Sequence, residues 1–100
     1  MPTHNWHLEV SPKAKSQISQ LPKRERSKVF HRMKELLEAE NPKAIPGAKK
    51  LAGQSEDRWR VRQGNYRIIF TVESGEVTHM KHTYKGTIWI QEVIHRRDAY

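Results

Sequence analysis

The sequence predicts an α+β domain in which a strand and a helical hairpin precede an antiparallel β-sheet. Apolar residues recur at intervals of three and four through residues 12–40, the spacing of amphipathic helices. Through residues 58–94, apolar and polar residues alternate between short turn motifs, as in antiparallel strands. One hundred residues suffice for a single domain, which we expect to span residues 1–100.

The first strand and the first helix are predicted near the N-terminus. Residues 6–10 alternate between apolar and polar side chains, the period of a half-buried strand. Ser11-Pro12 then provides an N-cap followed by proline at the first helical position. Pro22 disfavours helical geometry at Leu21, so we expect the first helix to end there.

A longer helix is predicted from Lys23 to about Glu40. Its apolar positions mark one face, opposite a face of Lys and Arg residues, and they are Val29, Met33, Leu36 and Leu37. Asn41-Pro42 ends this helix, and residues 41–57 are expected to form an extended connection. The two helices therefore form a helical hairpin.

A β-hairpin is predicted around the turn Gly64-Asn65. A two-residue loop there sets Gln63 opposite Tyr66 and Arg62 opposite Arg67. The apolar face of the hairpin is expected to pack on the helices and holds Trp59, Val61, Tyr66, Ile68 and Phe70. The outer face is basic and holds Arg58, Arg60, Arg62 and Arg67. Arginines directly across a hairpin repel each other, which indicates a site for an anion between them.

The C-terminal third predicts two further strands separated by turns at Ser74-Gly75 and Lys85-Gly86. The strand between these turns, at residues 77–82, is the weaker of the two. In the last strand, residues 87–94, one face is expected to hold Ile88, Ile90 and Glu92, and the other face Trp89, Gln91 and Val93.

Composition narrows the function. Lys and Arg number 19 against 11 Asp and Glu, a net charge of +8 that favours a polyanionic partner. There is no cysteine, which excludes disulfides, thiolate metal sites and cysteine nucleophiles. His79 and His82 fall on opposite faces of an extended strand, so we expect no metal site. No apolar run is long enough to span a membrane, so we expect a cytoplasmic protein that does not associate with a membrane. We also expect it to use no small-molecule cofactor.

A second basic cluster ends the chain, His95-Arg96-Arg97-Asp98-Ala99-Tyr100. It combines a proton-exchanging imidazole, guanidiniums that bind phosphate and a phenol that stacks or donates a proton. With this ending, the segments Val10-Ser11-Pro12-Lys13-Ala14, Leu21-Pro22, Leu51-Ala52-Gly53 and Trp59-Arg60-Val61-Arg62-Gln63-Gly64-Asn65-Tyr66-Arg67-Ile68-Ile69-Phe70 resemble the RelE/ParE superfamily of toxin-antitoxin systems.

That resemblance implies a curved antiparallel sheet and, in the RelE-like branch, a metal-independent mRNA endoribonuclease that acts in association with the ribosome. The catalytic residues that it implies are Arg60, Arg62, Arg67, His95, Arg96 and Tyr100. Further RNA contacts are expected from Lys49, Lys50, Arg58 and Arg97. In this scheme the 2'-hydroxyl attacks the adjacent phosphate, while arginines stabilise the charge that develops. His95 is the expected general base or acid.

Three functions stay open on the sequence. Besides the ribonuclease, the same fold serves poisons of DNA gyrase, and the basic face also suits a non-catalytic binding module. Glu56 or Asp57, close to the arginine strand, is an alternative base. The resemblance implies mRNA, the ribosome and a cognate antitoxin protein as partners, the antitoxin covering the basic face with an acidic or amphipathic segment.

Overall fold

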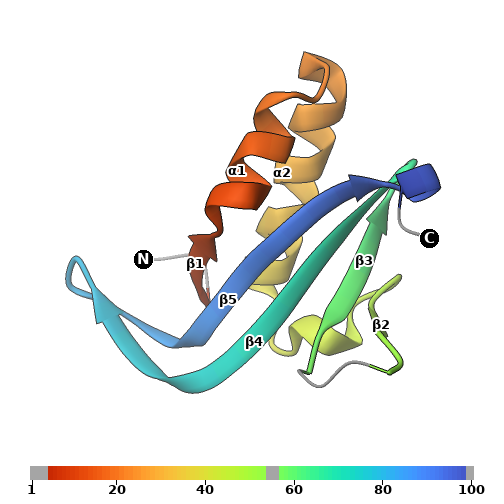
Figure 1. The fold of residues 1–100 in the computed structure, drawn as a ribbon. Helices are drawn as coiled ribbons and strands as arrows, with labels where there is room; N and C mark the ends of the chain where they lie inside the picture. The colour runs from red at the N-terminus through yellow and green to blue at the C-terminus, as the bar shows by residue number, and fades with distance from the viewer. Residues whose placement is uncertain (1–4, 54–56, 99–100) are drawn as a thin grey trace.

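A five-stranded sheet in the order β1-β5-β4-β3-β2 forms the centre of the protein in a computed structural model that describes residues 5–53 and 57–98. The strands are β1 (His7–Val10), β2 (Lys49–Lys50), β3 (Trp59–Gln63), β4 (Tyr66–His79) and β5 (His82–His95). The helices are α1 (Pro12–Ser19) and α2 (Lys23–Glu38), with short 3-10 turns at Pro42–Ala44 and Arg96–Asp98. Figure 1 shows α1 and α2 side by side behind the curved strands β4 and β5. The predicted α+β class is confirmed.

The helical hairpin follows from its caps and its apolar stripe. The Ser11 side chain accepts a hydrogen bond from the backbone N–H of Ala14 at 3.0 Å, and proline occupies the first turn, as predicted. The apolar face of α2 is buried and packs with β-sheet residues such as Phe70 in one core. The helix ends at Glu38, two residues earlier than predicted. No helix in the described residues is long and apolar enough to cross a membrane.

The register of the β3–β4 hairpin agrees with the sequence prediction. Arg62 pairs with Arg67, and Gln63 pairs with Tyr66, around the two-residue loop. Side chains at alternate positions then enter the core, so Val61 and Ile68 are fully buried on the helix side. The basic positions of β3 face the other way.

The predicted turns at Ser74-Gly75 and Lys85-Gly86 are wrong. Ser74 pairs with Gly86 inside one long β4–β5 ribbon, and the chain reverses at Met80 and Lys81. Both turn residues have positive φ, a conformation that their side chains gave no reason to expect. Glycine is required at position 86, where β5 pairs with Ser74 of β4, because a Cβ atom there would lie 2.2 Å from the carbonyl oxygen of Glu73.

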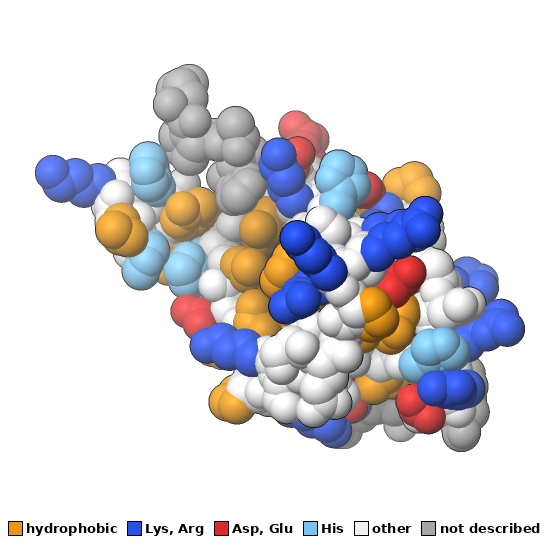
Figure 2. Space-filling model, turned by 90° about the horizontal axis from the view of Figure 1, so that it is seen from above, with side chains coloured by type: hydrophobic (Ala, Val, Ile, Leu, Met, Phe, Trp, Pro, Cys, Tyr) orange, Lys and Arg blue, Asp and Glu red, His pale blue; other side chains and the backbone are white. Residues whose placement is uncertain are grey.

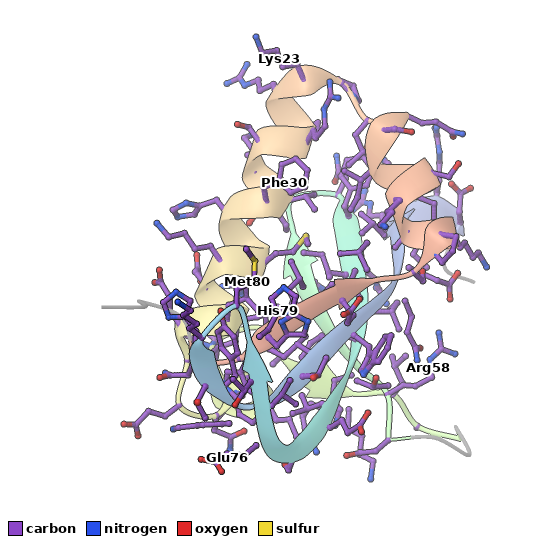
Figure 3. All side chains as sticks on the ribbon, turned by 90° about the vertical axis from the view of Figure 1, so that its left-hand side faces the viewer. Lys23, Phe30, Arg58, Glu76, His79 and Met80 are labelled. Carbon is purple, nitrogen blue, oxygen red and sulfur yellow. The ribbon has the colours of Figure 1, made fainter. Side chains whose placement is uncertain are left out.

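This ribbon is bent rather than flat. The pairing shifts register between Ser74 and Val77, and Figure 3 shows the ribbon bending near Glu76 with Met80 at its far end. The far end turns back toward β1, so the ring of His79 lies 4.8 Å from that of His7. The glycine-containing segments therefore supply bends within strands where the sequence suggested strand ends.

A second irregularity changes the faces of β5. Ile69 pairs with Glu92 but Phe70 pairs with Ile90, which leaves Gln91 as an extra residue in β5. After this bulge Val93 is buried in the core, and Glu92 lies on the opposite face. The predicted faces of Glu92 and Val93 are therefore wrong, since a β-bulge inverts the alternation beyond it.

The edges of the sheet also differ from the prediction. The first strand, β1, pairs with β5 in parallel, so the sheet is mixed and only its central strands are antiparallel. At the other edge, β2 pairs with β3 and brings Lys49 opposite Arg60. This short strand lies in the segment expected to be an extended connection, and it places two lysines at the basic face.

Candidate nucleic-acid interface

A cleft of about 550 Å³ opens on the face of β3 and β4 that points away from the helices. We call it the basic cleft. Five cationic residues line it, Lys49, Lys50, Arg58, Arg60 and Arg67. Its other lining residues are Leu51, Ala52, Ile69, Glu92 and Ile94. With five cations against one carboxylate, the lining of this cleft favours an anionic ligand.

Arg60 is held in place by the loop that precedes β2. Its Nη1 donates to the carbonyl oxygen of Gly47 at 3.3 Å, and the residue is only 8% exposed. Arg32 of α2 holds the same loop by donating to the carbonyl oxygen of Pro46, and it also donates to the carbonyl oxygen of Arg62 in β3. The sequence predicted an exposed Arg60, but β2 and its preceding loop cover the arginine. It is therefore a preorganised cation at the wall of the cleft.

Glu92 is the residue of the basic cleft that the sequence analysis missed. Its carboxylate accepts from Lys13 Nζ and from Arg58 Nη2, each at 2.9 Å. The hydrogen bond from Lys13, with a further one from Arg58, holds the Glu92 pKa below its ordinary value of 4.5 despite partial burial. A carboxylate held ionised in this way is a weak base, and it fixes Arg58 while lowering the charge of the cleft.

A smaller hollow of about 120 Å³ adjoins the cleft at the end of the sheet. We call it the arginine hollow, and it is lined by Arg62, Gly64, Tyr66, Arg67 and Arg96. The backbone N–H of Arg96 donates to the carbonyl oxygen of Asn65 at 2.7 Å, which ties the C-terminal turn to the β3–β4 loop. Because Arg67 lines both spaces, the hollow and the basic cleft form one continuous basic surface.

Three of the predicted catalytic residues therefore meet in the arginine hollow, Arg62, Arg67 and Arg96. His95 lies beside it, with its ring edge-on to that of Tyr66 at 5.2 Å, and its Nδ1 accepts from the backbone N–H of Arg97 at 3.3 Å. Because Nδ1 accepts this hydrogen bond, a neutral His95 ring carries its proton on Nε2. Neither His95 nor Arg97 is among the described residues that line the two spaces. Tyr100, the last predicted catalytic residue, lies outside the described residues.

Tyr66 was predicted to pack on the helices, and it does so only in part. It packs against the core but also lines the arginine hollow. Besides the arginines, its phenol is the only hydrogen-bond-donating side chain in the described lining of that hollow. Its pairing opposite Gln63, next to the turn, was the signal in the sequence that placed it at this end of the sheet.

Asp57, one of the two alternative bases suggested by the sequence, lines neither the basic cleft nor the arginine hollow. Asp57 binds Lys43 Nζ at 2.5 Å and accepts from Trp59 Nε1 at 3.0 Å. The hydrogen bond from Lys43, followed by that from Trp59, lowers the Asp57 pKa, which makes it a poor base. Glu56 lies outside the described residues. Within residues 5–53 and 57–98, no group of three or more His, Asp or Glu side chains is placed to hold a metal ion.

Lys and Arg side chains also spread beyond these two spaces. Figure 2 shows them on several parts of the face seen from above, with carboxylates in places between them. In Figure 3, Arg58 projects from the sheet on the side away from the labelled residues of α2. The basic surface is therefore extensive, and the two spaces are where its cations converge.

Solved structures share this fold. A chain of the archaeal RelE-RelB complex from Pyrococcus horikoshii matches 95% of this chain and 99% of its own length, with a TM-score of 0.66 and 23% identity. The chain has a RelE-like fold. A chain of the RelB-RelE antitoxin-toxin complex from Methanococcus jannaschii matches 91% of this chain and 93% of its own length (TM-score 0.64, 20% identity). For the RelBE2 toxin-antitoxin complex from Mycobacterium tuberculosis the shares are 92% and 99% (TM-score 0.64, 18% identity).

No protein-family model and no curated protein sequence matches the chain. The RelE-like fold is therefore established by three-dimensional similarity and not by sequence identity. It confirms the architecture that the resemblance implied, and the activity has to be argued from the site.

Proposed function

We propose that this protein is the toxin of a toxin-antitoxin pair and that it cuts mRNA at the ribosome without a metal ion, which stops translation. The observation that carries the proposal is the convergence of Arg62, Arg67 and Arg96 on one hollow at the end of a basic cleft. Three guanidiniums around so small a space fit one phosphate group. The RelE-like fold supports the same conclusion.

The chemistry that suits this site is an in-line transfer within the RNA. The ribose 2'-hydroxyl loses its proton and attacks the adjacent phosphorus, forming a new P–O bond, and the bond from phosphorus to the 5'-oxygen breaks. The products are a 2',3'-cyclic phosphate and a 5'-hydroxyl that takes up a proton. Arginines that already surround the phosphate stabilise the extra negative charge of the transition state.

Proton transfer is assigned to the groups beside the hollow. Tyr66 lines it, and His95 contacts Tyr66 edge-on. We assign His95 as the general base or acid and Tyr66 as the group that positions it, with Tyr100 retained from the sequence as a stacking or proton-donating residue. Arg60 and the basic cleft, with Lys49, Lys50 and Arg58, hold the RNA backbone next to the cut phosphate.

An antitoxin is the partner that this surface implies. Two of the solved structures that share the fold are described as toxin-antitoxin complexes, and a third as a RelE-RelB complex. A protein segment with acidic side chains would neutralise the basic cleft and exclude RNA from it. We expect such a partner to be expressed with this chain in the cytoplasm, where mRNA and ribosomes are its targets.

Mapping of mRNA 5' ends after brief induction tests the proposal. The wild-type chain should produce new 5'-hydroxyl ends, whereas Arg62→Ala with Arg96→Ala should not, because two of the three phosphate ligands are lost. Lys23→Ala with Arg24→Ala removes the same charge from exposed positions of α2 and is the matched control. DNA damage with intact mRNA in the wild type would instead support a gyrase poison.

A non-catalytic binding module is the second candidate, and one observation favours it. The described lining of the arginine hollow holds no carboxylate and no imidazole, so it is built to bind an anion whether or not a proton is transferred. That function predicts RNA binding without new 5' ends and without growth arrest. The same induction experiment therefore separates the three functions.

A further inference from the structure

Trp89 is a large aromatic side chain left exposed on the open face of the sheet. It is 42% exposed, whereas Trp6 is 6% exposed and Trp59 packs against the core. Its neighbours in β5, Ile88 and Ile90, are fully buried, so the indole points away from the helices. An exposed tryptophan of this kind contributes little to the stability of the fold and is common where a protein binds a partner.

The indole is also held in one orientation. Its Nε1–H donates to the carboxylate of Glu73 at 3.2 Å, and Trp89 pairs across the sheet with Thr71. The ring lines a shallow hollow of about 500 Å³, together with Asp57, Thr71, Val72, Glu73 and Gln91. We call it the Trp89 hollow. An oriented ring beside an open space provides a flat surface on which another ring can stack.

This hollow continues the basic surface along the same strands. Along β4, Thr71 lies four residues beyond Arg67, which at the rise of an extended strand is about 13 Å. The two spaces are also adjacent along β5, since Glu92 lines the basic cleft and the preceding residue, Gln91, lines the Trp89 hollow. A strand of RNA whose phosphates occupy the cleft therefore reaches the indole within a few nucleotides.

The basic cleft and the Trp89 hollow differ in charge, so the cleft suits the phosphates of a nucleotide chain and the hollow suits a base. Five cations line the basic cleft, whereas the described lining of the Trp89 hollow has no cation and includes two carboxylates. Asp57 is held by Lys43 and Lys50, which leaves Glu73 as the carboxylate beside the indole. A phosphate is repelled there, but a base with an amino group can stack on the ring and donate to Glu73.

We propose that Trp89 is a stacking platform for one base of a single-stranded RNA whose backbone lies in the basic cleft. The inference rests on the proposed function, since it requires RNA as the ligand. It adds a base-binding site to a surface that otherwise binds only phosphate. Because every base has a π face, the platform can accept any base, and because only an unpaired base can be splayed out onto the ring, it selects for single-stranded RNA. Glu73 adds a preference for bases that carry an amino group.

The test is equilibrium binding of the full chain to a fluorescently labelled RNA of about ten nucleotides. The RNA carries 2'-O-methyl groups, so that it has no attacking hydroxyl and cannot be cut. Trp89→Ala should weaken binding roughly 5- to 150-fold, the range that loss of one base–aromatic stack produces. Trp89→Phe should keep most of the affinity, and Trp89→Leu, which is apolar but has no aromatic face, should behave as alanine does.

A second measurement pairs the residue with the base. A series of RNAs is made in which each carries one abasic nucleotide at a different position. At one of these positions, the abasic nucleotide should weaken binding by the wild type as much as Trp89→Ala weakens binding to the intact RNA. The same abasic RNA should cost the Trp89→Ala chain almost nothing, because the two changes remove one contact. The quenching of tryptophan fluorescence by RNA should likewise be present in the wild type and mostly lost in Trp89→Phe.

The outcomes separate the two proposals. Tight wild-type binding that Trp89→Ala leaves unchanged would overturn the stacking platform and leave RNA recognition by the basic cleft intact. Failure of the wild type to bind RNA at all would overturn both. Equal losses for Trp89→Phe and Trp89→Ala would also overturn stacking, since they would show that only the indole's hydrogen bond to Glu73 matters.

Discussion

The guanidinium of Arg58 lies 2.9 Å from the carboxylate of Glu92 inside a cleft whose other charged lining residues are all cations. Lys13 reaches the same carboxylate from α1, so two cations share one anion. A carboxylate in this place opposes the binding of phosphate, and it also keeps Arg58 extended across the cleft. Its two effects can be separated by experiment.

Replacing Glu92 with Gln should tighten RNA binding. The change removes one negative charge from the cleft and keeps the size of the side chain, and at a distance of several ångströms in water it favours a phosphate by roughly threefold. Binding of labelled RNA at moderate salt measures it. Glu76→Gln makes the same change in net charge at an exposed position in the bend of the β4–β5 ribbon and should have little effect. Weaker binding by Glu92→Gln would instead show that orientation of Arg58 outweighs the charge.

The Glu92 pKa predicts how stability depends on pH. Because the folded protein holds this pKa below 4.5, the contribution of the ion pair is complete above about 4.5 and is lost as the pH falls through the lower folded value. The pair is partly exposed, so we expect about 1 kcal/mol or less. Urea unfolding of wild type and Glu92→Gln between about pH 7 and pH 3 should show a difference in free energy that disappears in acid. A difference that stays constant across this range would contradict the assignment.

Gly47 should be sensitive to substitution because it combines backbone strain with a close contact. Its φ is +87°, and a Cβ atom would lie 2.8 Å from Arg32 Nη2. Gly53 has a similar φ of +74° but nothing within 4 Å, so it is the matched control. We expect Gly53→Ala to cost about 1 kcal/mol from backbone strain alone and Gly47→Ala about 2 to 3 kcal/mol.

Thermal unfolding measures the Gly47 prediction, since about 1 kcal/mol lowers the Tm of a domain of this size by roughly 4–8 °C. In an Arg32→Ala background, the extra cost of Gly47→Ala should disappear, because the contacting atom is gone. Equal losses for the two glycines in the wild-type background would show that Arg32 moves aside freely. The carbonyl oxygen of Gly47 also holds Arg60, so Gly47→Ala is expected to weaken RNA binding as well.

The sequence predicted the central hairpin well because local chemistry determines it. The turn at Gly64-Asn65 sets the pairing of Arg62 with Arg67, and alternation then places each side chain on the correct face. This local pattern is sufficient to place Arg62 and Arg67 together. The segment of residues 12–38 was predicted for the same reason, since its proline, its cap and its apolar spacing are all local signals.

The errors concern features that depend on contacts distant in the sequence. Nothing local marks Gln91 as a bulge, because a glutamine suits either face of an edge or central strand, and so the faces of Glu92 and Val93 were exchanged. The glycines at 75 and 86 have the chemistry of turns but lie at the bend of the β4–β5 ribbon, where Gly75 has a positive φ and Gly86 lies close to the backbone of Glu73. Arg96 approaches Arg62 only because its backbone binds Asn65, a contact over 31 positions that periodicity cannot reveal.

Arg67 should have a larger effect than any other single arginine, because it lines both the basic cleft and the arginine hollow. Loss of one phosphate contact to single-stranded RNA should reduce the slope of log affinity against log salt by about 0.7, and we expect this for Arg67→Ala. Loss of a donor to the developing charge should also slow cleavage roughly 10²- to 10³-fold. Trp89→Ala should lower affinity with no change in the salt slope, and Arg24→Ala, on α2, should change neither quantity. Should Arg67→Ala alter the salt slope but leave the cleavage rate intact, the arginine would bind RNA beside the reacting phosphate and the catalytic charge would have to be stabilised by Arg62 and Arg96.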